Sequence, residues 1–143
     1  MAKQILVPLG RHEDAEALLA TVGDLARGAG ATVRLLHVMP APETITVPYG
    51  RVVAYASQLV DELEARGLAR LDAASVMLEG VPVERRVRFG EVADEIVEEA
   101  ARFGADVIAL PARPRRWWSG LRLGGVARRV ARRATAPVLV LSC

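Results

Sequence analysis

Two segments decide the fold of this chain: DVIALPARP at 106–114 and, nine residues later, GGVARRVARRATAPVLVL at 124–141. The apolar run Asp106–Leu110 predicts a buried strand, and residues 111–122 a loop. Leu123–Ala134 then predicts a helix and Pro137–Leu141 a second apolar strand. A strand, a crossover helix and a further strand make the repeating unit of a parallel sheet. The segment therefore predicts an α/β fold.

The rest of the chain repeats this alternation. Further strands are predicted at Gln4–Leu9, Thr32–Met39 and Val81–Phe89, and helices at Asp14–Arg27, Val52 to about Leu78, and Glu91–Phe103. Val81–Phe89 alternates only in part, which is typical of an edge strand. In the long helix an apolar stripe runs through Val52, Leu59, Val60 and Leu63. The order predicts a parallel sheet with helices on both faces.

Length and composition indicate a soluble globular protein. The 143 residues suit a single domain spanning 1–143, and 52% are hydrophobic and 25% charged. No apolar run approaches the roughly 20 residues of a membrane span, so no membrane partner is expected. The opening MAKQILVPLG does not resemble a signal peptide. Cys143 is the single cysteine, which is compatible with a reducing cytoplasm.

The net charge of +2 hides an asymmetry. Residues 1–106 carry 17 acidic and 11 basic side chains, whereas residues 107–143 carry eight arginines and no acid. One interpretation is a solvated helix face that also pairs with the acidic helices, and the other is an anion site. Arg128, Arg129, Arg132 and Arg133 favour the first.

Nucleic acid is not the expected partner, and anionic-polymer binding through the terminal arginines is the weaker hypothesis. Trp117 and Trp118, beside Arg115 and Arg116, have the chemistry to stack on a base. A tryptophan pair in a loop more commonly fills a core or an interface.

Motifs of catalysis and metal binding are missing from the sequence. It contains no GxxxxGK[ST], no GxGxxG between a strand and a helix, and no GxSxG elbow. His12, His37 and Cys143 lack the spacing of metal ligands. His37, inside an apolar strand, is interpreted as a core histidine, whereas His12 opens the first helix and is a candidate ligand contact. We therefore expect neither an enzyme nor a metal site.

Several pieces of the sequence resemble the universal stress protein family. They are the first strand ILVPLG (5–10), the second strand LLHVM (35–39), the helix and strand GEVADEIVEEAARFGADVIAL (90–110), and the closing GGVARRVARRATAPVLVL. The resemblance covers nearly the whole chain. It implies a flavodoxin-like, Rossmann-like three-layer sandwich, in which a five-stranded parallel sheet has the order 3-2-1-4-5. It also implies a cytoplasmic protein that is usually a homodimer. Members of the family divide into ATP binders and non-binders.

The residues that hold ATP in the binding members are largely replaced in this chain. In those members an aspartate ends the first strand and a G-x2-G-x9-G-[ST] loop holds the phosphates. The aspartate position matches Gly10, the first two glycines match Pro111 and Pro114, the third matches Gly124, and the hydroxyl residue matches Gly125. The prolines remove two backbone donors, and Gly125 offers no hydroxyl. ATP is therefore not expected to bind in the usual way.

The resemblance and the strand ends together define the candidate site. Candidate ligand-binding or nucleotide-binding residues are Leu9, Gly10, His12, Val38, Pro111, Arg113, Pro114, Gly124, Gly125 and Val126. Because the first and fourth strands flank the topological switch, Gly10, His12, Pro111 and Arg113 are expected to line one crevice.

The preferred function is a homodimeric regulatory or interaction module with an unknown protein partner and no cofactor. The alternative is an adenine-nucleotide (ATP or AMP) or phosphate-ligand binder with a remodelled loop, to which Arg113 adds charge. Dimerisation is predicted through the apolar C-terminal strand, which would lie at a sheet edge without any charge to protect it. Its residues are Pro137, Val138, Leu139, Val140 and Leu141.

Overall fold

The computed structural model describes residues 3–10, 15–40, 51–112 and 125–142. The strands are β1 (Gln4–Pro8), β2 (Thr32–Met39), β3 (Val83–Phe89), β4 (Val107–Ala112) and β5 (Val138–Ser142). The helices are α1 (Ala15–Ala29), α2 (Arg51–Ser75), the short 3-10 helix η1 (Val76–Leu78), α3 (Val92–Phe103) and α4 (Gly125–Arg133). This alternation of strands and helices confirms the predicted α/β class.

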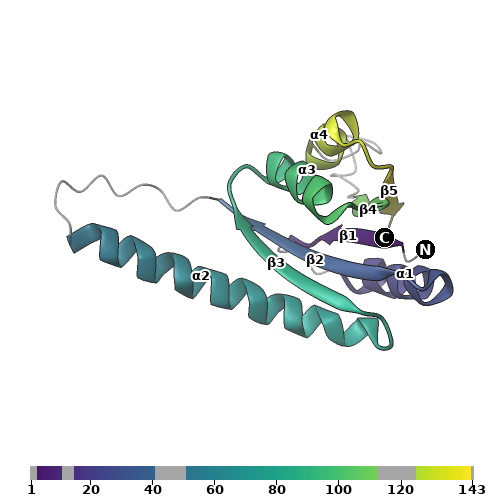
Figure 1. Cartoon of the computed structure of the whole chain (residues 1–143), viewed down its shortest axis with the longest axis horizontal. Coiled ribbons are helices and arrows are strands. Elements are labelled where there is room, and N and C mark those ends of the chain that lie inside the picture. The colour runs from purple at the N-terminus through teal and green to yellow at the C-terminus, as the bar shows by residue number, and fades with distance from the viewer. Residues whose placement is uncertain (1–2, 11–14, 41–50, 113–124, 143) are drawn as a thin grey trace, which may run out of the picture.

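All strand pairs in the sheet are parallel, and their order is β3-β2-β1-β4-β5. This is the order 3-2-1-4-5 that the family resemblance implied. In Figure 1, α1 and α2 cover one face of the sheet, and α3 and α4 cover the other. β3 lies at one edge, as its partial alternation predicted, and β5 lies at the opposite edge.

Alternate residues of the central strands supply two separate cores. Val7, Val33 and Leu35 pack with α1 and with Leu71 of α2. Leu6, Leu36 and Ile108 point to the opposite face and pack with α3 and α4. Because successive side chains of a strand point to opposite faces, a strand covered by helices on both sides must be apolar throughout. The near-continuous apolar runs in the sequence are explained in this way.

The boundary of the fourth strand was predicted wrongly. β4 continues to Ala112, so Pro111 belongs to the strand and not to the following loop. The β4–β5 register extends through Pro111↔Leu141 to Ala112↔Ser142, whereas the β1–β4 register comprises Ile5↔Val107 and Leu6↔Ile108. At Pro111 the strand thus has a registered neighbour on one side, and a proline without an N–H is tolerated in such an edge-like position. Pro137 precedes β5 and does not belong to it.

The long helix α2 packs on the sheet over only part of its length. Residues 57–66 include none that is buried, and Leu59 is 39% exposed. Figure 1 shows this half of α2 extending past the strands. Close packing begins at Gly67, where an added Cβ would lie 2.8 Å from Val87 Cγ2 and 2.9 Å from Met39 Cε. Among the described side chains of α2, burial along the predicted inward stripe therefore begins beyond residue 66.

Candidate functional site

The sheet reverses its direction of winding between β1 and β4. From β1 the chain crosses to β2 on one side, and from β4 it crosses to β5 on the other. In open α/β sheets, ligands bind outside the carboxyl ends of the strands at such a switch point. Leu9 and Pro111 each lie three residues beyond the paired Leu6 and Ile108. Leu9, the adjoining Gly10 and Pro111 therefore come to the same end of neighbouring strands, as predicted.

The backbone at Leu9 is held on both sides. Its N–H donates to the Leu36 carbonyl at 2.7 Å. Its carbonyl oxygen lies 2.8 Å from His37 Nδ1. A carbonyl can only accept, so Nδ1 carries the proton of this hydrogen bond. His37 is buried, which confirms its interpretation as a core histidine.

The end of β2 lies beside this backbone. Val38, one residue after His37, is half-buried, whereas Gly10 is exposed. A buried imidazole thus holds the Leu9 carbonyl, next to the exposed Gly10.

The first residues of α4 face the same end of the sheet. A helix that connects two parallel strands runs back along the sheet, so its N-terminus lies at the carboxyl ends of the strands. Gly125 opens α4 and is exposed, and Val126 is half-buried against the core beneath α3 and α4. The nearest atom to an added Cβ on Gly125 would be Arg129 Nη2, at 4.0 Å. Among the described residues, none would obstruct a side chain at this position.

The remaining predicted site residues cannot be placed in the same way. His12, Arg113, Pro114 and Gly124 lie outside the described residues. The structure thus places Gly10 and Pro111 at the same end of neighbouring strands, and the crevice that they were expected to line with His12 and Arg113 stays a prediction.

Four exposed charged side chains join α4 to α3, and we call them the α3–α4 clasp. Glu91 caps α3 by accepting from the Asp94 N–H at 2.8 Å, and it also accepts from Arg129 Nη1 at 2.7 Å. Asp94 pairs with Arg133 one turn further along. All four side chains are about half exposed. Two of the C-terminal arginines therefore pair with an acidic helix, as one interpretation of the charge asymmetry proposed.

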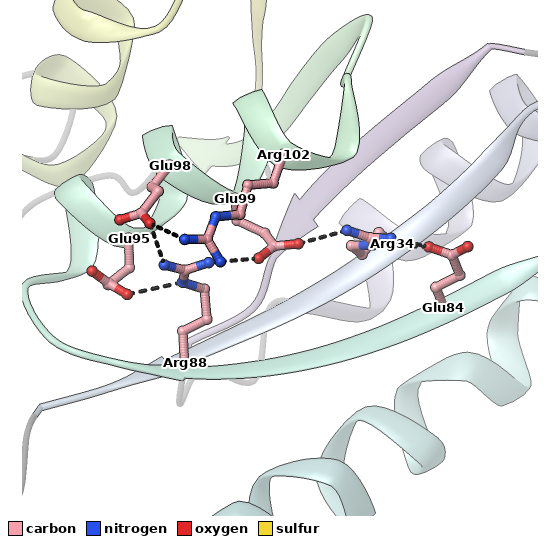
Figure 2. A network of polar contacts seen from close by, with 7 residues as sticks. All are labelled: Arg34, Glu84, Arg88, Glu95, Glu98, Glu99 and Arg102. Atoms are coloured by element: carbon pink, nitrogen blue, oxygen red, sulfur yellow. Dashed lines mark hydrogen bonds and ion pairs between the residues drawn. The ribbon is translucent and has the colours of Figure 1, made fainter.

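A second set of charges lies beneath α3, against the sheet, and we call it the buried arginine network (Figure 2). Its centre is Glu99, which is only 3% exposed. One carboxylate oxygen of Glu99 accepts from Arg34 Nη1 of β2 at 2.6 Å, and the other accepts from Arg88 Nη1 of β3 at 2.9 Å. The outer members are Glu84, Glu95, Glu98 and Arg102. The Arg34 guanidinium also lies 4.1 Å from the centre of the Phe103 ring.

The network keeps Arg34 and Arg88 charged. Burial lowers the pKa of Arg34, but hydrogen bonds to Glu84 and Glu99 raise it, and the net pKa lies above the ordinary value. Burial likewise lowers the pKa of Arg88, while hydrogen bonds to Glu95, Glu99 and Glu98 raise it, and its net pKa also lies above the ordinary value. A permanently cationic guanidinium does not transfer protons, so Arg34 and Arg88 are assigned a role in positioning α3 on the sheet.

Sequence reasoning missed this network, although two signals in the sequence point to it. Arg34 is the one charged residue of the mostly apolar strand β2. Glu99 lies three residues after Ile96 and four before Phe103, on the buried stripe of α3. An arginine and a glutamate on facing buried surfaces must be paired, because an isolated buried charge is costly.

Within the described ranges, no group of three or more His, Cys, Asp or Glu side chains is arranged to hold a metal ion. Among the helices of those ranges, none combines the length and apolar character needed to cross a membrane.

The fold and sequence match known proteins over nearly the full chain. The family model described as "Universal stress protein family" matches residues 1–142. The chain is 30% identical over 145 residues to universal stress protein G of Shigella flexneri, covering 99% of each chain.

Solved structures have the same architecture. The hypothetical protein MJ0577 is 27% identical, with a TM-score of 0.80 and coverage of 100% of this chain and 97% of that one. The universal stress protein of Archaeoglobus fulgidus in complex with dAMP is similar in fold, at 22% identity, a TM-score of 0.65 and coverage of 98% and 97%. On this evidence the chain belongs to the universal stress protein family.

Proposed function

We propose that this chain is a cytoplasmic, homodimeric universal stress protein that regulates by contacting another protein. It does not bind ATP in the manner of the nucleotide-binding members, and it catalyses no reaction. The proposal that ATP does not bind in the usual way rests on the residue types at the topological switch. Pro111 offers no N–H there, Gly10 no carboxylate and Gly125 no hydroxyl.

The energetic consequence is large. A hydrogen bond to a charged group contributes about 1.5–3 kcal/mol, so the loss of several such contacts weakens binding by orders of magnitude. Titration calorimetry of the full chain with Mg-ATP tests this. We expect no binding tighter than roughly high micromolar. A low-micromolar dissociation constant would overturn this part of the proposal, and Arg113→Ala would then test the arginine as the compensating group.

Restoring the motif provides the complementary test. Gly125→Ser adds the missing hydroxyl at a position with room for a side chain. The triple variant Gly10→Asp, Pro111→Gly, Gly125→Ser is expected to bind ATP at least tenfold more tightly than the wild type, since one added charge-assisted contact suffices for that factor. Gly28→Ser is the matched control, because it also has space around it but lies on α1.

The homodimer rests on the difference between the two sheet edges. β3, at one edge, carries Glu84, Arg85, Arg86 and Arg88, whereas β5, at the other, carries no charge. Charged side chains discourage the pairing of an edge strand with another chain, and an uncharged apolar edge invites it. Val138, Leu139, Val140 and Leu141 are all half-buried within one chain. A two-fold pairing of β5 with its own copy would cover them further.

Light scattering at tens of micromolar tests the dimer. Twice the chain mass of 15.4 kDa gives an expected dimer of about 31 kDa. Val140→Lys is expected to shift it to monomer, and Val140→Thr, which keeps the β-branched shape, is the control. A wild-type chain that stays monomeric, or a dimer whose interface leaves residues 137–141 untouched, would overturn this part of the proposal.

The second candidate function is the binding of an adenine nucleotide or another phosphate ligand through a remodelled loop. It is favoured by the Archaeoglobus fulgidus relative, whose structure is a complex with dAMP. The nucleotide content of gently purified protein distinguishes the two candidates. Stoichiometric nucleotide released on denaturation would favour the second, and its absence would favour the first.

A further inference from the structure

Two exposed surfaces of the molecule carry charges that find no partner among the described residues. One lies on the projecting half of α2 (residues 57–66), where Asp61 and Glu64 are exposed. The other is the outer side of α4, where Arg128 and Arg132 are exposed. None of these four side chains takes part in an ion pair within the described ranges. The two surfaces therefore have opposite charge and are both available.

The spacing of these charges repeats that of the α3–α4 clasp. In the clasp, two acids three residues apart on one helix hold two arginines four residues apart on another. Asp61 and Glu64 are also three residues apart, and Arg128 and Arg132 are four apart. Side chains at either spacing lie on one side of a helix, about one turn from each other. The chain thus already pairs two helices by the geometry that these two surfaces offer.

The two surfaces cannot meet within one molecule. α2 packs on one face of the sheet through Leu71, whereas α4 packs on the other through Ala127 and Val130. Figure 1 shows the projecting half of α2 and α4 on opposite sides of the sheet. Arg128 and Arg132 are on the side of α4 turned away from its buried residues. Any pairing of the two surfaces must therefore occur between molecules.

We propose that the projecting half of α2 docks on the outer side of α4 of a second copy of this chain. Asp61 and Glu64 pair with the second copy's arginines at 128 and 132. The half-buried Val60, which adjoins Asp61, is covered by the contact. Charge complementarity over the whole chain favours this occupant, because residues 1–106 carry 17 acids against 11 bases and residues 107–143 carry eight arginines and no acid.

The contact is weak and sensitive to salt. Exposed ion pairs each add little to binding, and salt screens them over a Debye length of about 10 Å at 0.1 M. Because the two surfaces differ, the contact is head-to-tail and extends from one molecule to the next, unlike a two-fold pairing of β5. Its signature is an average mass that rises with concentration at low salt and returns to that of the smallest species at high salt.

Sedimentation velocity on charge-reversed variants of the full chain tests the proposal. One variant carries Asp61→Arg and Glu64→Arg, and the other carries Arg128→Glu and Arg132→Glu. Each alone presents like charges on both surfaces, so its association at low salt is expected to weaken about tenfold or more. An equimolar mixture of the two variants restores opposite charges and is expected to associate as the wild type does. Restoration by mixing cannot arise from misfolding, because a misfolded variant gains nothing from its partner.

Matched controls change the net charge equally at other places. Glu16→Arg with Glu79→Arg matches the first variant, and Arg70→Glu with Arg86→Glu matches the second; all four side chains are exposed and lie outside both docking surfaces. Both controls are expected to associate as the wild type does. The proposal is overturned if the wild type shows no salt-sensitive association up to about millimolar concentration. It is equally overturned if the mixture does not associate, or if the controls lose association to the same extent as the test variants.

Discussion

The helix α3 carries ion pairs on two sides, and the two sides differ in burial. Toward the sheet, Glu99 is 3% exposed and holds Arg34 and Arg88. Toward α4, Glu91 and Asp94 hold Arg129 and Arg133, with all four side chains about half exposed. The same chemical groups thus make one network whose centre solvent hardly reaches and one set of pairs that solvent surrounds.

The difference in burial changes what each network contributes. Exposed ion pairs add about 0.2–1 kcal/mol each and weaken with salt, because water already stabilises the separated charges. A buried pair adds little net stability over an apolar replacement, yet the removal of one partner costs about 3–5 kcal/mol because a charge is left without compensation. The buried arginine network therefore fixes the position of α3 on the sheet. The α3–α4 clasp holds α4 against α3 only weakly and reversibly.

The largest expected effect comes from removing the central charge of the buried arginine network. Glu99→Gln leaves Arg34 and Arg88 without the carboxylate that joins them, although each keeps another acidic partner. We expect the free energy of unfolding to fall by about 3 kcal/mol, at the lower end for a broken buried pair. Chemical denaturation measures this. Glu98→Gln, on the half-exposed side of the same helix, is the control and is expected to cost under about 1 kcal/mol. Equal losses in both variants would contradict the comparison.

A smaller effect is expected when the cation is kept but its shape is changed. Arg34→Lys removes the planar group that contacts both Glu84 and Glu99 and lies over the Phe103 ring. We expect a loss of about 1–2 kcal/mol in unfolding free energy. Arg27→Lys changes an exposed pair with Asp24 in the same way and is expected to cost less than about 0.5 kcal/mol. A tolerated Arg34→Lys would show that charge alone holds α3.

For the exposed α3–α4 clasp we expect a smaller loss of unfolding free energy, and we expect salt to remove this loss. Arg129→Ala with Arg133→Ala is expected to lower the unfolding free energy by about 1 kcal/mol at low salt. In about 1 M salt, where the Debye length is about 3 Å, the loss is expected to approach zero. Arg128→Ala with Arg132→Ala makes the matched control, because these arginines have no described acidic partner, and it is expected to cost nothing. A loss that persists in high salt would mean that the clasp acts through packing.

The smallest expected effect is that of pH: the stability contributed by the arginines of the buried network should not change near neutral pH. The pKa of Arg34 and of Arg88 is raised on folding. A base with a raised pKa contributes stability at every pH below its unfolded pKa, and loses it only as the pH rises through the folded pKa. Both values lie above the ordinary arginine range. The difference in unfolding free energy between the wild type and Arg34→Lys should therefore stay constant from about pH 6 to pH 9. A difference that shrinks over this interval would contradict the argument.

The candidate site could be predicted from the sequence only in part. The order of strands and helices follows from local apolar periodicity, and a parallel sheet with this order has one switch point, so Leu9, Gly10 and Pro111 could be assigned to it in advance. The extension of β4 through Pro111 could not, because a proline ordinarily signals a loop. The registered neighbour that makes this position a strand lies thirty residues further along the chain, at Leu141.

Local pattern by itself determined the class of fold, the two apolar cores and the core role of His37, because burial on both faces demands continuous apolar strands. Tertiary structure alone decided which charges are buried and which part of the apolar stripe of α2 is covered. Glu99 and Glu98 are neighbours of one type in the sequence, yet one is 3% exposed and the other has a side chain that is 47% exposed. Leu63 and Leu71 are equally apolar, yet only the second is buried. Helical periodicity predicts which residues lie on the same side of a helix. The length of the neighbouring strands decides which part of that side packs on the sheet.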